Sequence, residues 1–193
     1  MITSQIRDLV KHVMPDDFVH GYPHVERVRK LALEIAKEIE EPVDKEVLEI
    51  AALLHDIGRY GSSGKHHAEA SAEIADFLLS LLNYPEDKRK NVVEAIMAHS
   101  YSLNAEAVSL EAKILSDADK LDALGAVGIA RVFMFSCQHS RSLEDTIKHM
   151  KEKILRLQSL MYTSPGRRMA RNRTEIIENF LHNLEKELST PST

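Results

Sequence analysis

The stretch AALLHDIGRY, residues 51–60, contains a run of apolar residues that ends in His55 and Asp56. The apolar residues continue those that follow Glu46, so we predict a helix that is buried up to this point. Burying an imidazole or a carboxylate costs free energy unless the group is paired or bound to something. His55 and Asp56 are therefore the first candidates for a functional site.

The composition is that of a globular protein with a core. The 193 residues include 44% hydrophobic and 28% charged residues, a single cysteine (Cys137) and a formal net charge of -5. One cysteine excludes an internal disulfide. No long basic run, no signal-peptide pattern and no apolar run near the roughly 18 residues of a membrane span is found. We expect a cytoplasmic protein with no membrane partner and no dedicated nucleic-acid surface, whose oligomeric state the sequence leaves open.

Helical periodicity recurs along the whole chain, whereas no convincing strand pattern is found. Asp44, Pro85 and Ser142 are predicted to begin helices, and Gly125 is predicted to bend or break one. A continuous helix is predicted from Ser142 to about residue 161. We therefore predict an all-α fold, a single-domain bundle of about nine helices over residues 1–193.

Four histidines end apolar stripes, because residues three or four apart share one face of a helix. His24 is in line with three aliphatic residues (Val28, Leu31, Ile35), and His67 with another set (Ala70, Ile74, Leu78). His55 and His99 end similar stripes. A single histidine at the end of an apolar stripe is more often a hydrogen-bonded core residue than a ligand. Four of them, together with an adjacent aspartate, favour a functional site at which the helix ends meet. The histidines without such companions are predicted to lie at the surface: His12, His20, His139, His149 and His182.

The segment SDADKLDALG supplies three further carboxylates, those of Asp117, Asp119 and Asp122. Asp119 and Asp122 share a side of a helix, while Asp117 lies about 200° around from Asp119. They cannot all reach one ion, so a site with a single metal would most simply use one of them. The alternative is a solvated face on which Lys120 is the partner.

Imidazoles and carboxylates together suit a divalent ion such as Mn, Fe, Co, Ni, Zn or Mg. The absence of a cysteine cluster argues against a structural zinc site. Four protein ligands on a six-coordinate ion leave positions for water and for a substrate oxygen. This composition is typical of hydrolytic sites, where the metal activates water and polarises the bond to be cleaved.

These residues resemble the signature of the HD-domain superfamily of metal-dependent phosphohydrolases, a His, an adjacent His-Asp pair and a distant Asp. They occur here in GYPHVERV, LLHDIGRY and LSDADKLDALG, so that the resemblance covers about residues 20–135. HHAEASAEIADFL and VVEAIMAHS resemble family segments that carry further histidines. LMYTSPGRRMARNRTEIIENFLHNLEKEL resembles the last helices of small stand-alone HD hydrolases from bacteria and archaea. The C-terminal helices are expected at about residues 142–188.

The resemblance implies that His24, His55, Asp56 and one more aspartate hold the metal. Asp119, which is followed by KLDAL, fits the family pattern best, and Asp117 is the second choice.

Two related branches fit the sequence less well. In the cyclic-dinucleotide phosphodiesterases, Gly-Tyr-Pro follows a His-His-Glu, whereas here GYP precedes His24 and Ser100 follows His99. Guanosine tetraphosphate hydrolases carry Asp-Arg-Leu-His-Asn, whereas the chain has DKLDA from Asp119. Cyclic-nucleotide and guanosine tetraphosphate phosphodiesterases remain alternatives.

We therefore expect a hydrolase that cleaves a phosphate ester or anhydride of a nucleotide-like small molecule with a metal-activated water. Asp56 would also orient or deprotonate the water. His67 and His99 would face the phosphate or bind a second ion. Arg59 and Lys120 would contact the phosphate, since cations balance its developing charge. The rival from another class is a non-catalytic metal and nucleotide sensor.

Overall fold

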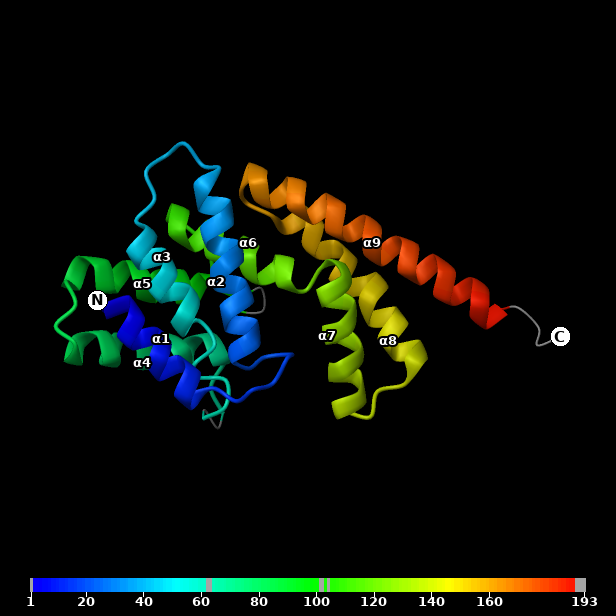
Figure 1. Cartoon of the computed structure of the whole chain (residues 1–193), viewed down its shortest axis with the longest axis horizontal. Coiled ribbons are helices and arrows are strands. Elements are labelled where there is room, and N and C mark those ends of the chain that lie inside the picture. The colour runs from blue at the N-terminus through cyan, green and yellow to red at the C-terminus, as the bar shows by residue number, and fades with distance from the viewer. Residues whose placement is uncertain (1, 62–63, 101–102, 104, 190–193) are drawn as a thin grey trace. The chain divides into compact units, whose positions relative to one another are not determined.

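The computed structural model describes residues 2–61, 64–100, 103 and 105–189 of the chain. These residues form nine α-helices with two short helical segments of other types and no β-strand (Figure 1), so the all-α prediction is confirmed. The chain divides into two compact units, Met1–Asp119 and Lys120–Thr193, which are described separately below. The single-domain organisation stays a prediction.

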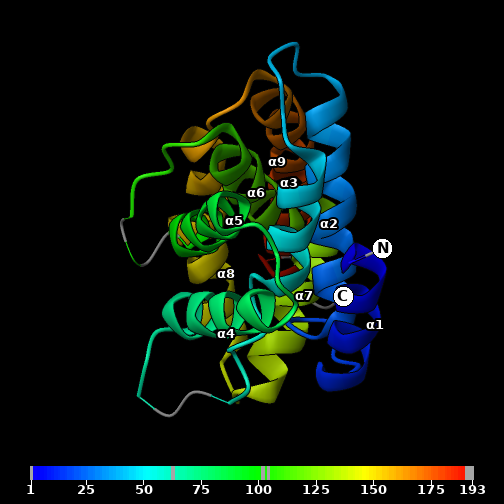
Figure 2. The same cartoon turned by 90° about the vertical axis from the view of Figure 1, so that its left-hand side faces the viewer.

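The N-terminal unit is built around helix α3, whose residues Val47 and Leu48 and all residues from Ile50 to Leu54 are buried. Helix α3 packs against α1, α2 and α5, and α5 packs against α4. Figure 2 shows α4 and α5 beside α3. The six helices that begin in this unit are α1 (Ile2–Val13), α2 (Tyr22–Lys37), α3 (Lys45–Leu54), α4 (His67–Leu81), α5 (Glu86–His99) and α6 (Leu110–Asp122), which crosses into the second unit.

The predicted helix starts agree with the local hydrogen bonds. The carboxylate of Asp44 accepts from the backbone N–H groups of Glu46 and Val47, both at 3.1 Å, and so caps α3. Pro85 is the N-cap residue of α5, and Pro23 lies in the first turn of α2. As a result, α2, α3 and α5 each place a histidine near one of their ends.

Helix α4 departs from the stripe predicted for it. Ile74, which was expected to face the core in line with His67, is 38% exposed. Ala70 of the predicted stripe is buried, and the other buried residues of α4 are Ala68, Ser71, Ala72, Ala75 and Leu79. The buried side of α4 is therefore turned away from Ile74. His67, on the same stripe as Ile74, is only partly buried, and its side chain is 21% exposed.

The C-terminal unit pairs α7 (Gly125–Gln138) with the long α9 (Ser164–Ser189). Gly125 has φ +73°, a left-handed conformation that favours glycine, so the break predicted there is confirmed. Ser142 caps α8 (Leu143–His149) through the N–H of Asp145, also as predicted. The prediction of one continuous helix to about residue 161 is wrong, because the backbone changes to a π-helix over Met150–Ile154 and to a 3-10 helix over Leu155–Leu160.

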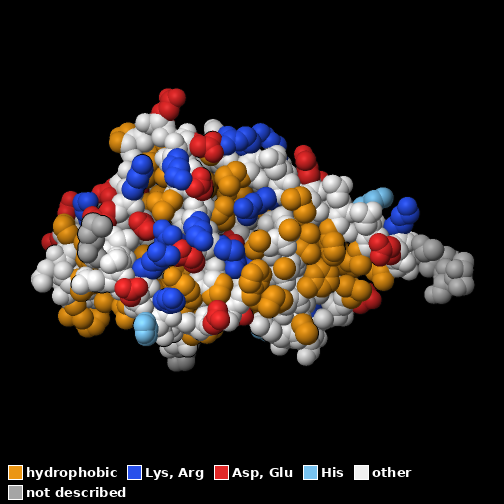
Figure 3. Space-filling view, in the orientation of Figure 1, with side chains coloured by type: hydrophobic (Ala, Val, Ile, Leu, Met, Phe, Trp, Pro, Cys, Tyr) orange, Lys and Arg blue, Asp and Glu red, His pale blue; other side chains and the backbone are white. Residues whose placement is uncertain are grey.

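Surface charges of opposite sign alternate over α2. Arg29 pairs with both Glu26 and Glu49, and Arg7 also pairs with Glu26. Figure 3 shows Lys and Arg side chains with acidic side chains between them on this face. Among the described residues, no single helix has the length and apolarity needed to cross a membrane, and α6 with α7 meets that test only as a bent pair.

Candidate metal centre

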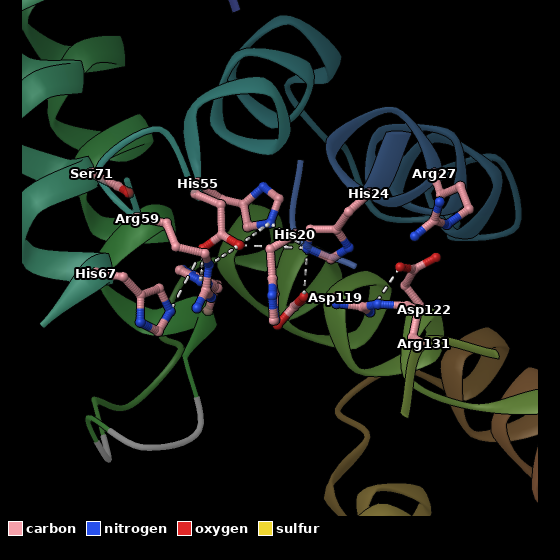
Figure 4. A network of polar contacts seen from close by, with 12 residues as sticks. His20, His24, Arg27, His55, Arg59, His67, Ser71, Asp119, Asp122 and Arg131 are labelled. Carbon is pink, nitrogen blue, oxygen red and sulfur yellow. Dashed lines mark hydrogen bonds and ion pairs between the residues drawn. The ribbon is translucent and has the colours of Figure 1, made fainter. Parts of the chain in front are cut away.

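Four helices of the N-terminal unit bring imidazoles and carboxylates to one place (Figure 4). His24 lies in the first turn of α2, His55 follows the last residue of α3, and Asp56 comes directly after it. His99 is the last residue of α5, and Asp119 lies on α6. The first four are at most 1% exposed, while the side chain of Asp119 is 29% exposed. The predicted metal ligands therefore meet at one buried centre.

The separations between the facing atoms fit a shared cation. Two ligand atoms that are each about 2.1 Å from one ion lie about 3.0 to 3.4 Å apart. The Nε2 atoms of His24 and His55 are 3.2 Å apart, and His24 Nε2 lies 3.5 Å from Asp119 Oδ1 and 3.6 Å from Asp56 Oδ2. His55 Nε2 lies 3.9 Å from Asp56 Oδ2. The donor set thus has nearly the spacing that a divalent ion requires.

Backbone carbonyls fix the orientation of two imidazoles. His55 Nδ1 lies 2.7 Å from the carbonyl oxygen of Ala52, and His99 Nδ1 lies 2.5 Å from that of Ile96. A carbonyl oxygen only accepts hydrogen bonds, so in each ring Nδ1 carries the proton and donates it. The Nε2 atom of each ring then faces the centre, as it does in a metal-ligating histidine.

The charge states also suit a metal. Burial alone would raise the pKa of Asp56, but His55 and the Arg59 guanidinium hold it well below its usual value. Burial likewise opposes ionisation of Asp119, yet the surrounding imidazoles, His24 first, lower its pKa. Burial lowers the pKa of His99 to about 4, and the neighbouring His55 adds to this effect. At neutral pH the centre therefore combines ionised carboxylates with a neutral His99 imidazole, the forms that bind metals.

Two overlapping groups of ligands share His55. In the first, His24, His55 and Asp119 have ligand atoms within 4.8 Å of one another, and in the second, His55, Asp56 and His99 do. Neither group contains a cysteine, which agrees with the donor set of a catalytic rather than a structural site. One ion or two adjacent ions are compatible with this arrangement.

His67 and Arg59 lie at the edge of the centre. His67 Nε2 is 3.7 Å from Asp56 Oδ1, and burial together with the Arg59 charge lowers the pKa of His67 to about 3. Arg59 donates from Nε to Asp56 Oδ2 at 2.7 Å and from Nη2 to Asp56 Oδ1 at 3.0 Å. Arg59, which the sequence suggested as a phosphate contact, thus holds both oxygens of Asp56 in this structure.

The aspartates of α6 have separate positions. Asp119 faces His24, whereas Asp117 is fully buried and belongs to neither group of ligands found among the described residues. In the C-terminal unit, Asp122 accepts a hydrogen bond of 2.8 Å from Arg131 Nη1. The Nζ of Lys120, in the same unit, lies 5.6 Å from the centre of the Tyr162 ring. A phosphate contact by Lys120 stays a prediction.

A family model for the HD domain matches residues 21–124, more than half of the chain, and this range contains all the candidate ligands. The chain belongs to the HD-domain family. Over 194 aligned residues it is 33% identical to the uncharacterized protein YpgQ of Bacillus subtilis, with 96% of this chain and 93% of that protein covered.

Solved structures of similar proteins share the fold over nearly the whole chain. The crystal structure of Bacillus subtilis YpgQ in complex with ADP has a TM-score of 0.81 and 31% identity, covering 98% of this chain and 95% of that chain. A predicted HD superfamily hydrolase from an uncultured Thermotogales bacterium has a TM-score of 0.71 and 33% identity, covering 96% and 92%. The expected resemblance to small HD hydrolases is therefore confirmed.

The turn that begins with His55 and Asp56, called the HD turn below, is hydrogen-bonded to α4. The N–H of Gly58 donates to the buried Ser71 Oγ at 3.0 Å. A Cβ added at Gly58 would lie only 2.5 Å from the Ser71 nitrogen, so no larger residue fits without movement. This contact keeps His67, at the start of α4, close to Asp56.

His20 was predicted to be a surface residue and is only partly exposed. It is half-buried, and the centre of its ring lies 6.2 Å from that of His24. His20 lies in the segment before α2, where no helical stripe signals an inward-facing position. Its spacing of four residues before His24 is the one signal that could have pointed to it.

Proposed function

We propose that the chain is a metal-dependent phosphohydrolase that cleaves a phosphate ester or anhydride of a nucleotide-like small molecule. The observation that carries this proposal is the meeting of Nε2 atoms and ionised carboxylates at ligand spacing in one buried centre. In this proposal, His24, His55, Asp56 and Asp119 hold a divalent ion. When bound there, such an ion would lower the pKa of water and polarise a phosphate oxygen.

The chain's own residues have separate parts in the proposed reaction. Arg59 fixes both oxygens of Asp56, which keeps that carboxylate ionised and correctly turned. His67, which is partly exposed, would face the phosphate, and His99 would do so from the buried side or bind a second ion. Lys120 would contribute positive charge toward the substrate.

A nucleotide is the preferred substrate class. The relative YpgQ has been crystallised in complex with ADP, and this chain matches that structure over 98% of its length. Hydrolysis of a nucleoside triphosphate and release of phosphate from a monoester are the two reactions that the family resemblance suggests. The nucleoside products tell them apart, because a triphosphate leaves a nucleoside mono- or diphosphate and a monophosphate leaves the free nucleoside.

The test is a panel of nucleoside mono-, di- and triphosphates incubated with metal-free protein and added Mn, Mg, Co or Ni. We expect turnover that depends on the added ion and disappears in the His55→Ala variant. A matched control is His182→Ala, which removes an exposed histidine from α9. Stoichiometric ion and nucleotide binding without any turnover would instead favour the sensor module.

A further inference from the structure

His20 has a firmly held backbone beside the metal centre. Its N–H donates to Asp17 Oδ2 at 2.8 Å, and the N–H of Tyr22 donates to the carbonyl oxygen of Pro15 at 2.9 Å. The loop is tightly closed at Gly21, where an added Cβ would lie 2.1 Å from the Pro15 oxygen. A side chain on such a loop is presented in a defined direction.

The same carboxylate joins this loop to the HD turn. Asp17 Oδ2 also accepts from the hydroxyl of Tyr60 at 3.2 Å, and Tyr60 directly follows Arg59. Asp17 thus links the segment that carries His20 to the turn that carries Arg59. Figure 4 shows the His20 ring between Arg59 and Asp119, in front of the buried ligands.

His20 differs from the buried imidazoles in two respects. It is half-buried, whereas His24 and His55 are at most 1% exposed. Neither ligand group found among the described residues includes it. His20 thus joins His67 and Arg59 as a partly exposed nitrogen group at the edge of the centre.

When a divalent ion is bound, the carboxylates of Asp56 and Asp119 balance its charge, so the charge of an approaching phosphate is left without compensation. Hydrogen-bond donors at the edge can stabilise this charge, and hydrogen bonds to charged oxygens are the stronger ones. Arg59 is already engaged by Asp56 through two hydrogen bonds. His20 also lies beside the centre, with its ring centre 6.2 Å from that of His24, and can supply a further N–H donor.

We infer that His20 contacts a phosphate oxygen of the bound nucleotide and is not a metal ligand. This inference rests on the proposed function for its substrate class but not for the cleavage step. It predicts that His20 contributes to nucleotide affinity while the ion count stays the same.

The test is ADP binding, measured by calorimetry at saturating Mn²⁺ on the parent, His20→Ala and His20→Gln. We expect the alanine variant to bind ADP about tenfold more weakly or worse, the size expected for a hydrogen bond to a charged group. Glutamine keeps an N–H donor and should recover part of the affinity. The control is His12→Ala, an exposed histidine of α1, which should bind ADP as the parent does.

Affinity of His20→Ala within twofold of the parent would overturn the inference, as would failure of the parent to bind ADP. Loss of Mn²⁺ from this variant would make His20 a ligand and overturn it too. Circular dichroism checks that the variants are folded. Parent protein that binds ADP through His20 but hydrolyses no nucleotide would refute only the proposed hydrolase activity.

Discussion

Acid should destabilise the metal-free protein through His99. This imidazole is 1% exposed, and burial with the nearby His55 lowers its pKa to about 4 from the ordinary value of 6.5. Between these two pH values the unfolded chain binds a proton on this residue and the native chain does not. Stability that is present above pH 6.5 is therefore lost as the pH falls toward 4.

The size of this effect follows from the pKa difference. One pH unit corresponds to about 1.4 kcal/mol, so the interval between 6.5 and 4 corresponds to about 3 kcal/mol for His99 alone. His67, whose pKa is lowered to about 3, acts in the same direction, but its partial exposure reduces its share. Asp56, with a lowered carboxyl pKa, contributes only below this interval.

The assay is urea unfolding of parent and His99→Gln in a chelator at several pH values from 7 to 4.5. The variant should lose less free energy of unfolding on acidification than the parent does, whatever its stability at pH 7. His182→Gln, at an exposed position, should follow the parent. Parallel pH profiles for parent and His99→Gln would refute the reasoning.

Three further outcomes are expected. Asp119→Ala should lose the metal and the activity together, whereas Asp117→Ala should mainly reduce stability; elemental analysis that gives the opposite result would transfer the ligand role to Asp117. If the centre holds one ion, His67→Ala and His99→Ala should keep it and lose about 10² to 10⁴-fold in turnover; a parent with two ions, of which either variant loses one, contradicts this. Gly58→Ala should lower the free energy of unfolding by about 1 to 3 kcal/mol, because its Cβ would overlap the backbone of α4. An unchanged urea midpoint would contradict this, since it would mean that the helix accommodates the added methyl group without loss of stability.

Local signals were sufficient for most of the fold. Asp44 and Ser142 accept the hydrogen bonds that the capping rule requires, and Gly125 adopts a positive φ, so helix boundaries at these residues were predictable. The π-helix that begins at Met150 was not, because no proline or glycine interrupts the sequence there. Ile74 was misjudged because a period of 3.6 residues does not tell which side of α4 the core occupies.

The site was predictable where its residues lie on regular helices. His24, His55 and His99 end apolar stripes, and the helix ends converge as expected. His20 was missed because its position depends on a loop closed by long-range contacts, among them the one from Tyr60 to Asp17. The pairing of Arg59 with Asp56 depends on side-chain geometry at the HD turn, which spacing alone does not determine.

The most direct test of the metal centre is the binding of Mn²⁺ to metal-free protein, followed by electron paramagnetic resonance and elemental analysis. The parent should bind a stoichiometric ion, and His55→Ala should bind none, because His55 belongs to both groups of ligands. His182→Ala should bind as the parent does. Stoichiometric Mn²⁺ retained by a folded His55→Ala variant would contradict the account.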